Sequence, residues 1–390
     1  MGLTVSLYYA FTTNYITVYD ASRDYWLYNY YRVNPVWHQM EGLYALQNTS
    51  LFSTYIPAIV QRITHLPAEG FFKVYISVWA ASVPVVAYLI SKKFVGKGLS
   101  LFSALYIMGW VAFYQGGSFA RLNVAVAIFG LVILALLSNW RHRYIIAGIG
   151  ASLLPFAHYG TAVIAVIIIG GYWLCLLIKR SWRKTAYIGL LLLALTGVFW
   201  YWHAVENKLA WAYLSALIND TSVMAKQGAL NSGVFDSVVL RDGQAAGSNM
   251  PTSLMSRDRI TQAFFGVNNP DNAGVFRLNY YLLFFAWLTV MLMGYGAWVV
   301  LRGRYPDYKG MVFWSFVAIG LTILIPQISR GYGIEKVYYQ AIVVTAPCLV
   351  LGGHKVASKL HIPAWVFLSA VLIPYVGLMW VYGVIPSVLG

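Results

Sequence analysis

Asp20 and Asp24 stand four residues apart in a Tyr-rich stretch near the start of the chain. On a helix, this spacing places both carboxylates on one face. Paired carboxylates beside a membrane can hold a divalent cation such as Mg²⁺ or Mn²⁺, or one of them can act as a general base that deprotonates an attacking hydroxyl. The alternative is a solvated helix end, at which Asp24 pairs with Arg23 or Arg32.

Arg121 opens an apolar run in the segment QGGSFARLNVAV, with no acidic residue nearby in the sequence. An arginine embedded in a membrane is costly. It therefore requires either a carboxylate from another segment or an anionic ligand, and its planar donors fit phosphate. The alternative is an arginine that snorkels to the lipid headgroups.

Further polar residues lie at the ends of other apolar runs. His158 and Tyr159 interrupt two such runs in PFAHYGTAV, where the histidine could bond a phosphate or a carboxylate, although a turn histidine is more often satisfied by a neighbouring carbonyl. Arg277, Arg330 and Tyr332 are predicted to face the same side. The arginines would form a basic rim around the acidic pair, suited to a lipid-linked phosphate or pyrophosphate, or each would be an interfacial anchor.

The elements that must position these residues are membrane-spanning helices. Hydrophobic residues make up 60% of the chain and charged residues 10%, and the mean hydropathy is +0.65. In hydrocarbon, the backbone of each apolar run must satisfy its own hydrogen bonds, which predicts an all-α polytopic membrane protein. The runs predict about eleven spans: 1–18, 72–91, 98–114, 120–140, 143–157, 161–179, 185–204, 279–301, 310–327, 337–353 and 363–386.

Charge sets the orientation of these spans. If successive loops alternate sides, one side contains a single acid, Asp307, and fourteen basic residues: Lys92, Lys93, Lys97, Arg141, Arg143, Lys179, Arg180, Arg183, Lys184, Arg302, Arg304, Lys309, Lys355 and Lys359. The positive-inside rule makes that side cytoplasmic. The net charge of +15 therefore reports orientation and does not indicate a nucleic-acid partner.

The opposite, extracytoplasmic side receives two long segments, 19–71 and 205–278. In the first, the apolar spacing after Pro35 predicts a helix along the membrane surface, and residues 51–63 predict a second one. The second segment is rich in Gly, Ser, Asn and Asp and is expected to be a long loop or lid. The span at 1–18 has no cytoplasmic flank, which predicts that Met1 is a truncation or an internal start.

The order of these motifs resembles a known family. The pair Asp20 and Asp24, then FFKVYISVWAASVPVVAYLISKKF, FARLNVAV and AHYGT, and then ISRGYGIEKVYYQ before APCLVLGG, is similar to a mainly archaeal family of predicted membrane proteins of unknown function. That family is itself similar to the GT-C glycosyltransferases. The resemblance implies a single GT-C-like transmembrane domain over 1–390 that transfers a sugar from a polyprenyl-phosphate or polyprenyl-pyrophosphate carrier at the outer face of the cell membrane.

Residue by residue, the resemblance implies a catalytic or metal-binding role for Asp20 or Asp24. It matches Arg121, His158 and Arg330 as polar positions without assigning their roles. The implied partners are membrane lipid, the lipid-linked donor and a glycan or protein acceptor in cell-envelope glycan or glycoprotein assembly. Two alternatives stay open: an inactive GT-C-like scaffold subunit that associates with other membrane subunits, and a lipid or glycolipid transporter, which charges confined to the membrane edges disfavour.

Overall fold

The computed structural model describes residues 19–40, 45–110, 120–206, 276–303, 305–324 and 334–389, together with Leu7. The regular elements in this part of the chain are helices. Three short helices come first: α2 (Tyr19–Val33), α3 (Ala45–Asn48) and α4 (Tyr55–Thr64). Ten further α-helices follow: α5 (Ala68–Ser91), α6 (Lys97–Met108), α8 (Ala120–Leu136), α9 (Arg143–Ala157), α10 (Tyr159–Ile178), α11 (Trp182–Phe199), α15 (Phe276–Arg302), α16 (Pro306–Leu324), α18 (Ile334–Lys359) and α19 (Ala364–Leu389).

Five of the described helices are long and apolar enough to cross a membrane: Ala68–Ser91, Tyr159–Ile178, Trp182–His203, Phe284–Arg302 and Lys336–Lys359. Four shorter apolar helices accompany them, at Lys97–Met108, Ala120–Leu136, Arg143–Ala157 and Ala364–Trp380. Each predicted span from 72–91 onward overlaps a described helix, whereas the first, 1–18, lies outside the described residues apart from Leu7. The count of eleven spans stays a prediction.

Large apolar side chains are exposed along the outer helices of the bundle, as a surface that meets lipid requires. Examples are Val78 and Val85 on α5 and Leu190 and Leu193 on α11. Tryptophans mark the predicted cytoplasmic ends. Their exposed rings belong to Trp140, Trp182, Trp298 and Trp365, and the guanidinium of Arg302 lies 3.8 Å from the centroid of the Trp298 ring.

Helices α8 and α18 form the centre of the bundle. Every residue of α18 from 337 to 353 is buried, and α8 is buried along its length except at Leu131. A helix that is apolar on all sides is stable only inside other protein or lipid. Around α18 pack α15, α16, α6, α19, α5 and α8. Residues at the outer ends of α8 and α18 are therefore held rigidly.

The closest helix contact lies between α15 and α18, and it depends on glycine. A methyl group at Gly296 would overlap the carbonyl oxygen of Cys348, and one at Gly352 would overlap that of Leu292. Backbone atoms cannot move aside cheaply, so we expect Gly296→Ala to lower the free energy of unfolding by about 1–3 kcal/mol. Gly294→Ala, on the same helix with no atom within 4 Å of the added methyl, is the matched control. Unfolding in mixed detergent micelles measures both, and equal stabilities would contradict the prediction.

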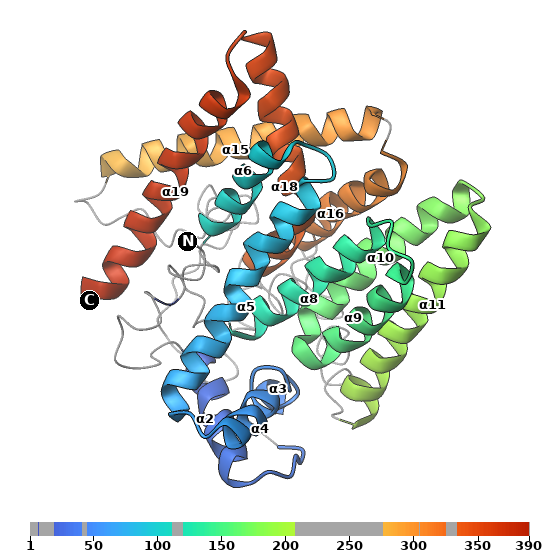
Figure 1. Cartoon of the computed structure of the whole chain (residues 1–390), viewed down its shortest axis with the longest axis vertical. Coiled ribbons are helices and arrows are strands. Elements are labelled where there is room, and N and C mark those ends of the chain that lie inside the picture. Colours follow the sequence, from blue (N-terminus) through green and yellow to red (C-terminus); the bar gives the residue numbers. More distant parts are fainter. Residues whose placement is uncertain are drawn as a thin grey trace, which may run out of the picture.

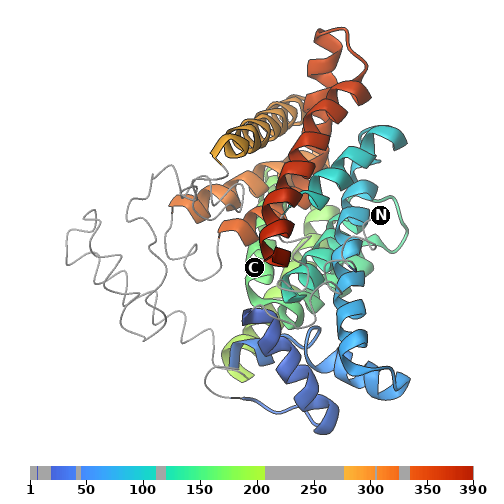
Figure 2. The ribbon, with the colours of Figure 1, turned by 90° about the vertical axis from the view of Figure 1, so that its left-hand side faces the viewer.

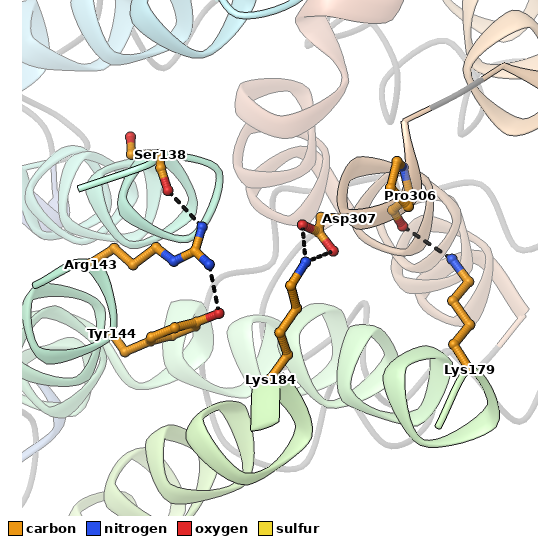
Figure 3. A network of polar contacts seen from close by, with 7 residues as sticks. All are labelled: Ser138, Arg143, Tyr144, Lys179, Lys184, Pro306 and Asp307. Atoms are coloured by element: carbon orange, nitrogen blue, oxygen red, sulfur yellow. Dashed lines mark hydrogen bonds and ion pairs between the residues drawn. The ribbon is translucent and has the colours of Figure 1, made fainter. Parts of the chain in front are cut away.

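Three of the predicted cytoplasmic loops lie near one another at one end of the bundle, and Figure 3 shows their polar contacts. Lys184 Nζ lies 2.6 Å from Asp307 Oδ2, and Lys179 Nζ donates to the carbonyl of Pro306 at 3.2 Å. Arg143 donates to the carbonyl of Ser138 at 2.8 Å. The single acid assigned to this side is thus paired with one of its lysines, and the segments around 179–184 and 306–307 lie side by side as the alternating topology requires.

The short helices lie at the opposite end. Figure 1 shows α2, α3 and α4 at the lower end of the molecule and the turn between α18 and α19 at the upper end, and Figure 2 shows the same separation from the side. The short helices have their own small core, whose buried members are Leu27, Tyr28, Tyr31, Ala58, Phe72, Ile76 and Ala120. Burial raises the pKa of Tyr28 and Tyr31 to about 12. Both therefore stay protonated, and they donate to the carbonyls of Ala68 and His38.

The predicted surface helix from Pro35 is wrong for residues 34–40, which are not helical. Their carbonyls bond to side chains from other segments instead of to the following turn. The amide of Asn48 donates to the carbonyl of His38 at 2.8 Å, and the hydroxyl of Tyr55 donates to that of Pro35 at 2.8 Å. The second predicted helix is present as α4, although it begins at Tyr55. Of the long segment 205–278, residues 207–275 lie outside the described residues.

Candidate active site

Helix α2 carries both predicted carboxylates. Its inward face repeats at helical spacing through Asp24, Leu27, Tyr28 and Tyr31, all of them buried. Position 20 lies one turn before Asp24 on the same stripe of the helix. The side chain of Asp20 lies outside the described part of the structure. Positions 20 and 24 therefore share one stripe of α2, and a joint role of the two carboxylates stays a prediction.

Asp24 meets Arg121. The guanidinium Nε of Arg121 lies 3.2 Å from Oδ1 of Asp24, and the side chains are only 7% and 1% exposed. The solvated helix end is thus wrong for Asp24, and Arg32 instead donates to Gln61 and Asn29. Arg121, the second residue of α8, thus pairs with a carboxylate from a distant segment of the chain. This agrees with the expectation that a buried charge needs an opposite charge, because burying an unpaired charge is costly.

His158 caps helix α10 at the same end of the bundle. Its Nδ1 accepts the amide N–H of Thr161 at 3.3 Å, so the ring proton is on Nε2. Burial, followed by the positive charges of Arg121 and Lys336, lowers the pKa of His158 well below its usual value. The partner at Nδ1 is thus a backbone amide, and a carbonyl partner for the other ring nitrogen stays a prediction. A neutral imidazole therefore lies within the electrostatic reach of two cations.

Uncharged polar side chains connect this point to α18. The amide of Gln340 donates to the carbonyl of Thr161 at 3.0 Å, and the hydroxyl of Tyr339 donates to Asn123 Oδ1 at 2.9 Å. Asn123 lies two residues after Arg121 on α8. Helices α8, α10 and α18 therefore share a polar layer at the end of the bundle that contains Arg121. Buried polar groups in such a layer fix the helices relative to one another only when they are hydrogen-bonded.

No family model matches the sequence, and no curated protein matches it. Two of the solved structures that are similar to this chain are of the same protein. Both are of the oligosaccharyltransferase of Archaeoglobus fulgidus: the apo form, at 15% identity and a TM-score of 0.49, and a complex with zinc and sulfate, at 16% identity and a TM-score of 0.48. The alignments cover 98% of this chain and 55% and 53% of those chains, so the chain spans about half their length. Because both TM-scores are below 0.5, the likeness carries no inference about activity.

The structure places four of the predicted site residues in one region. Asp24 contacts Arg121, the charge of Arg121 acts on His158, and the ring of Tyr159 lies 5.1 Å from that of His158. The others are not placed with them. Arg330 and Tyr332 lie outside the described residues, and Arg277 is in α15 with its side chain outside the described part.

Sequence reasoning missed Asn123, His203 and Gln340 as site residues. His203 lies in the π-helical turn η2 (Trp200–Glu206) that ends α11, where Nε2 donates to the carbonyl of Pro155 at 3.0 Å. The available signal was a single uncharged polar residue within each apolar run, as in RLNVAV and VYYQAIVV. Such residues in membrane helices commonly hydrogen-bond between helices.

A metal site at Asp20 and Asp24 finds no further support among the described residues. Asp24 faces a guanidinium, whose positive charge opposes a dication, and no group of three His, Cys, Asp or Glu side chains assembles within the described ranges. A Mg²⁺ or Mn²⁺ ion there stays a prediction. Adding either ion after treatment with EDTA, in the transfer assay given below, tests it.

The neutral state of His158 predicts a pH-dependent stability. Because the folded-state pKa is lowered, the unfolded chain binds a proton below about pH 6.5 that the folded chain does not bind. The free energy of unfolding should therefore fall as the pH drops below this value, with a limiting slope of about 1.4 kcal/mol per pH unit for this group. His158→Asn supplies a capping oxygen in place of Nδ1 and should remove this contribution. Unfolding between pH 5 and 8 measures it, with substitution of the exposed His361 by asparagine as the control. Equal slopes for His158→Asn and the wild type would contradict it.

Proposed function

We propose that this chain is a GT-C-type glycosyltransferase that moves a sugar from a polyprenyl-phosphate-linked donor to an acceptor at the extracytoplasmic face of the cell membrane. One observation carries the proposal. The ion pair between Asp24 and Arg121 fastens α2 to the beginning of α8. This pairing supports a site at that end of the bundle, where a lipid headgroup would arrive.

The cations suit the phosphate of the donor. Arg121 and Lys336 both act on His158, and Asp24 is the acid paired with Arg121. Because Asp24 pairs with Arg121, the charge of Lys336 remains to attract the negative charge of a phosphate diester. In a site shielded from water, such a cation also stabilises the phosphate that departs during transfer, when its negative charge grows.

The reaction is a direct displacement. The acceptor's nucleophilic group attacks the anomeric carbon, the bond from that carbon to the phosphate oxygen breaks, and its electron pair leaves with the polyprenyl phosphate. Asp20 takes the proton from the acceptor. Asp24 is the less suitable base because it is paired with Arg121, so we assign it the role of positioning α2 and Arg121.

A scaffold subunit is the second candidate, favoured by the near-complete burial of the same ion pair. A buried ion pair of this kind can have a purely structural role, in which it fastens one helix to another. The two candidates differ in what they require of Arg121. An enzyme would need the positive charge of Arg121 for transfer even in a variant that folds normally, whereas a scaffold would need only the intact fold.

The test is transfer by the purified chain in proteoliposomes. We expect product from at least one of polyprenyl-phosphate glucose, mannose and galactose, or the corresponding pyrophosphates, with a mixed glycan and peptide acceptor pool. Glu69→Gln serves as a carboxylate control, since Glu69 is exposed and pairs with Lys73 at 2.7 Å on α5. No product from any donor, together with normal insertion of the protein, would favour the scaffold.

A further inference from the structure

Two buried hydrogen-bond acceptors lie beside the proposed site without a donor. The side chain of Gln340 is fully buried; its amide nitrogen donates to the carbonyl of Thr161, but no described residue donates to its Oε1. His203 is 2% exposed, and its Nε2 carries the proton because it bonds a carbonyl oxygen. Its Nδ1 is therefore an acceptor, and no described residue donates to that atom either.

Both acceptors border His158. Gln340 bonds the carbonyl of Thr161, whose amide N–H in turn bonds Nδ1 of His158. His203 affects His158 electrostatically, and its ring lies 6.3 Å from that of Tyr159. The two atoms thus come from α18 and η2 and flank the residue that also senses Arg121 and Lys336.

A buried acceptor without a donor destabilises a fold by about 1–3 kcal/mol. A ligand that supplies the donor recovers this energy, and the chemistry of the two atoms identifies the class of ligand. A phosphate diester has only acceptor oxygens and would be repelled by them, whereas a sugar hydroxyl can donate. The cations and these acceptors therefore fit different parts of one lipid-linked sugar.

We propose that His203 and Gln340 form a subsite that accepts hydrogen bonds from hydroxyl groups of the donor sugar. The inference rests on the proposed function, and it adds the residues that distinguish the sugar from its carrier. An acceptor subsite rejects an analogue that lacks the hydroxyl, because the buried atoms are then left without partners.

Binding separates this subsite from the phosphate site. The probes are polyprenyl-phosphate glucose, mannose and galactose, with bare polyprenyl phosphate as the reference, and the readout is equilibrium binding to detergent-solubilised protein. We expect at least one hexose to increase affinity over the bare phosphate. His203→Phe removes the acceptor at Nδ1 together with the donor to Pro155, and Gln340→Leu removes the acceptor Oε1 together with the donor to Thr161. Each variant should weaken binding of that hexose about tenfold while bare polyprenyl phosphate binds as before.

Thr345→Ala is the matched control on α18, since this buried hydroxyl bonds only the carbonyl of Ala341 among the described residues, at 3.1 Å. It should leave both affinities unchanged. Equal binding of hexose and bare phosphate by the wild type would overturn the inference, as would unchanged hexose binding with lowered stability of the variants, which would assign the acceptors to a buried water. If the variants lose affinity for the sugar but the wild type shows no transfer, the subsite is supported and the proposed function is contradicted. If the wild type transfers sugar but the variants keep their affinity for it, only the subsite is contradicted.

Discussion

Asp20→Asn is expected to lower the rate of sugar transfer by about 10²–10⁴-fold, the usual contribution of a positioned general base. Asparagine has the size of aspartate but cannot take the acceptor's proton. The loss should appear in kcat, because donor binding depends on other residues, namely Arg121 and Lys336. Single-turnover transfer of a radiolabelled polyprenyl-phosphate hexose in proteoliposomes measures the rate, and separate titration of the donor measures its affinity.

Folding should survive this change. Helix α2 packs through Leu27, Tyr28 and Tyr31, and Asp24 pairs with Arg121 of α8. Asp20→Glu, which keeps a proton acceptor, should retain more of the rate than Asp20→Asn, whereas Glu69→Gln should retain all of it. A full transfer rate in Asp20→Asn would remove the base from the mechanism and return the catalytic assignment to Asp24.

Much of the fold could be predicted from hydrophobicity, because lipid gives an apolar run little choice but a helix. The runs at 143–157 and 161–179 are examples, since described helices begin within two residues of both. The prediction failed in the polar segment after Pro35, where apolar residues also recur at helical spacing. There the conformation depends on side chains from Asn48 and Tyr55, which local spacing does not reveal.

Charged residues of the candidate site were easier to predict from the sequence than uncharged ones. A buried arginine must have an anionic partner, so the position of Arg121 predicts an ion pair. The sequence does not show which acid outside the membrane is the partner, and the structure shows that Asp24 pairs with it. Uncharged residues gave a weaker signal, because Gln340 and His203 are tolerated in membrane helices for many reasons. Only the structure shows which polar atoms of these two side chains have hydrogen-bond partners among the described residues and which do not.

The ion pair itself gives the second large expected effect. Asp24→Leu leaves the buried guanidinium of Arg121 without this counter-charge, and Arg121→Met does the same to the carboxylate of Asp24. Each single variant should lower the free energy of unfolding by about 3–5 kcal/mol. The double variant should recover most of the loss, because replacing both members of a buried pair with apolar residues is often neutral. Unfolding of the four proteins in mixed micelles gives the coupling energy.

Activity of the double variant then separates the two candidate functions. If Arg121 only fastens α8 to α2, an apolar contact can replace it, and the refastened protein should behave as the wild type in every assay. If Arg121 also holds the donor phosphate, the double variant should be stable, inserted and unable to transfer sugar, with weakened binding of bare polyprenyl phosphate. A stable double variant with a wild-type transfer rate would contradict the phosphate role, whereas a stable but inactive one ties the positive charge to catalysis independently of folding.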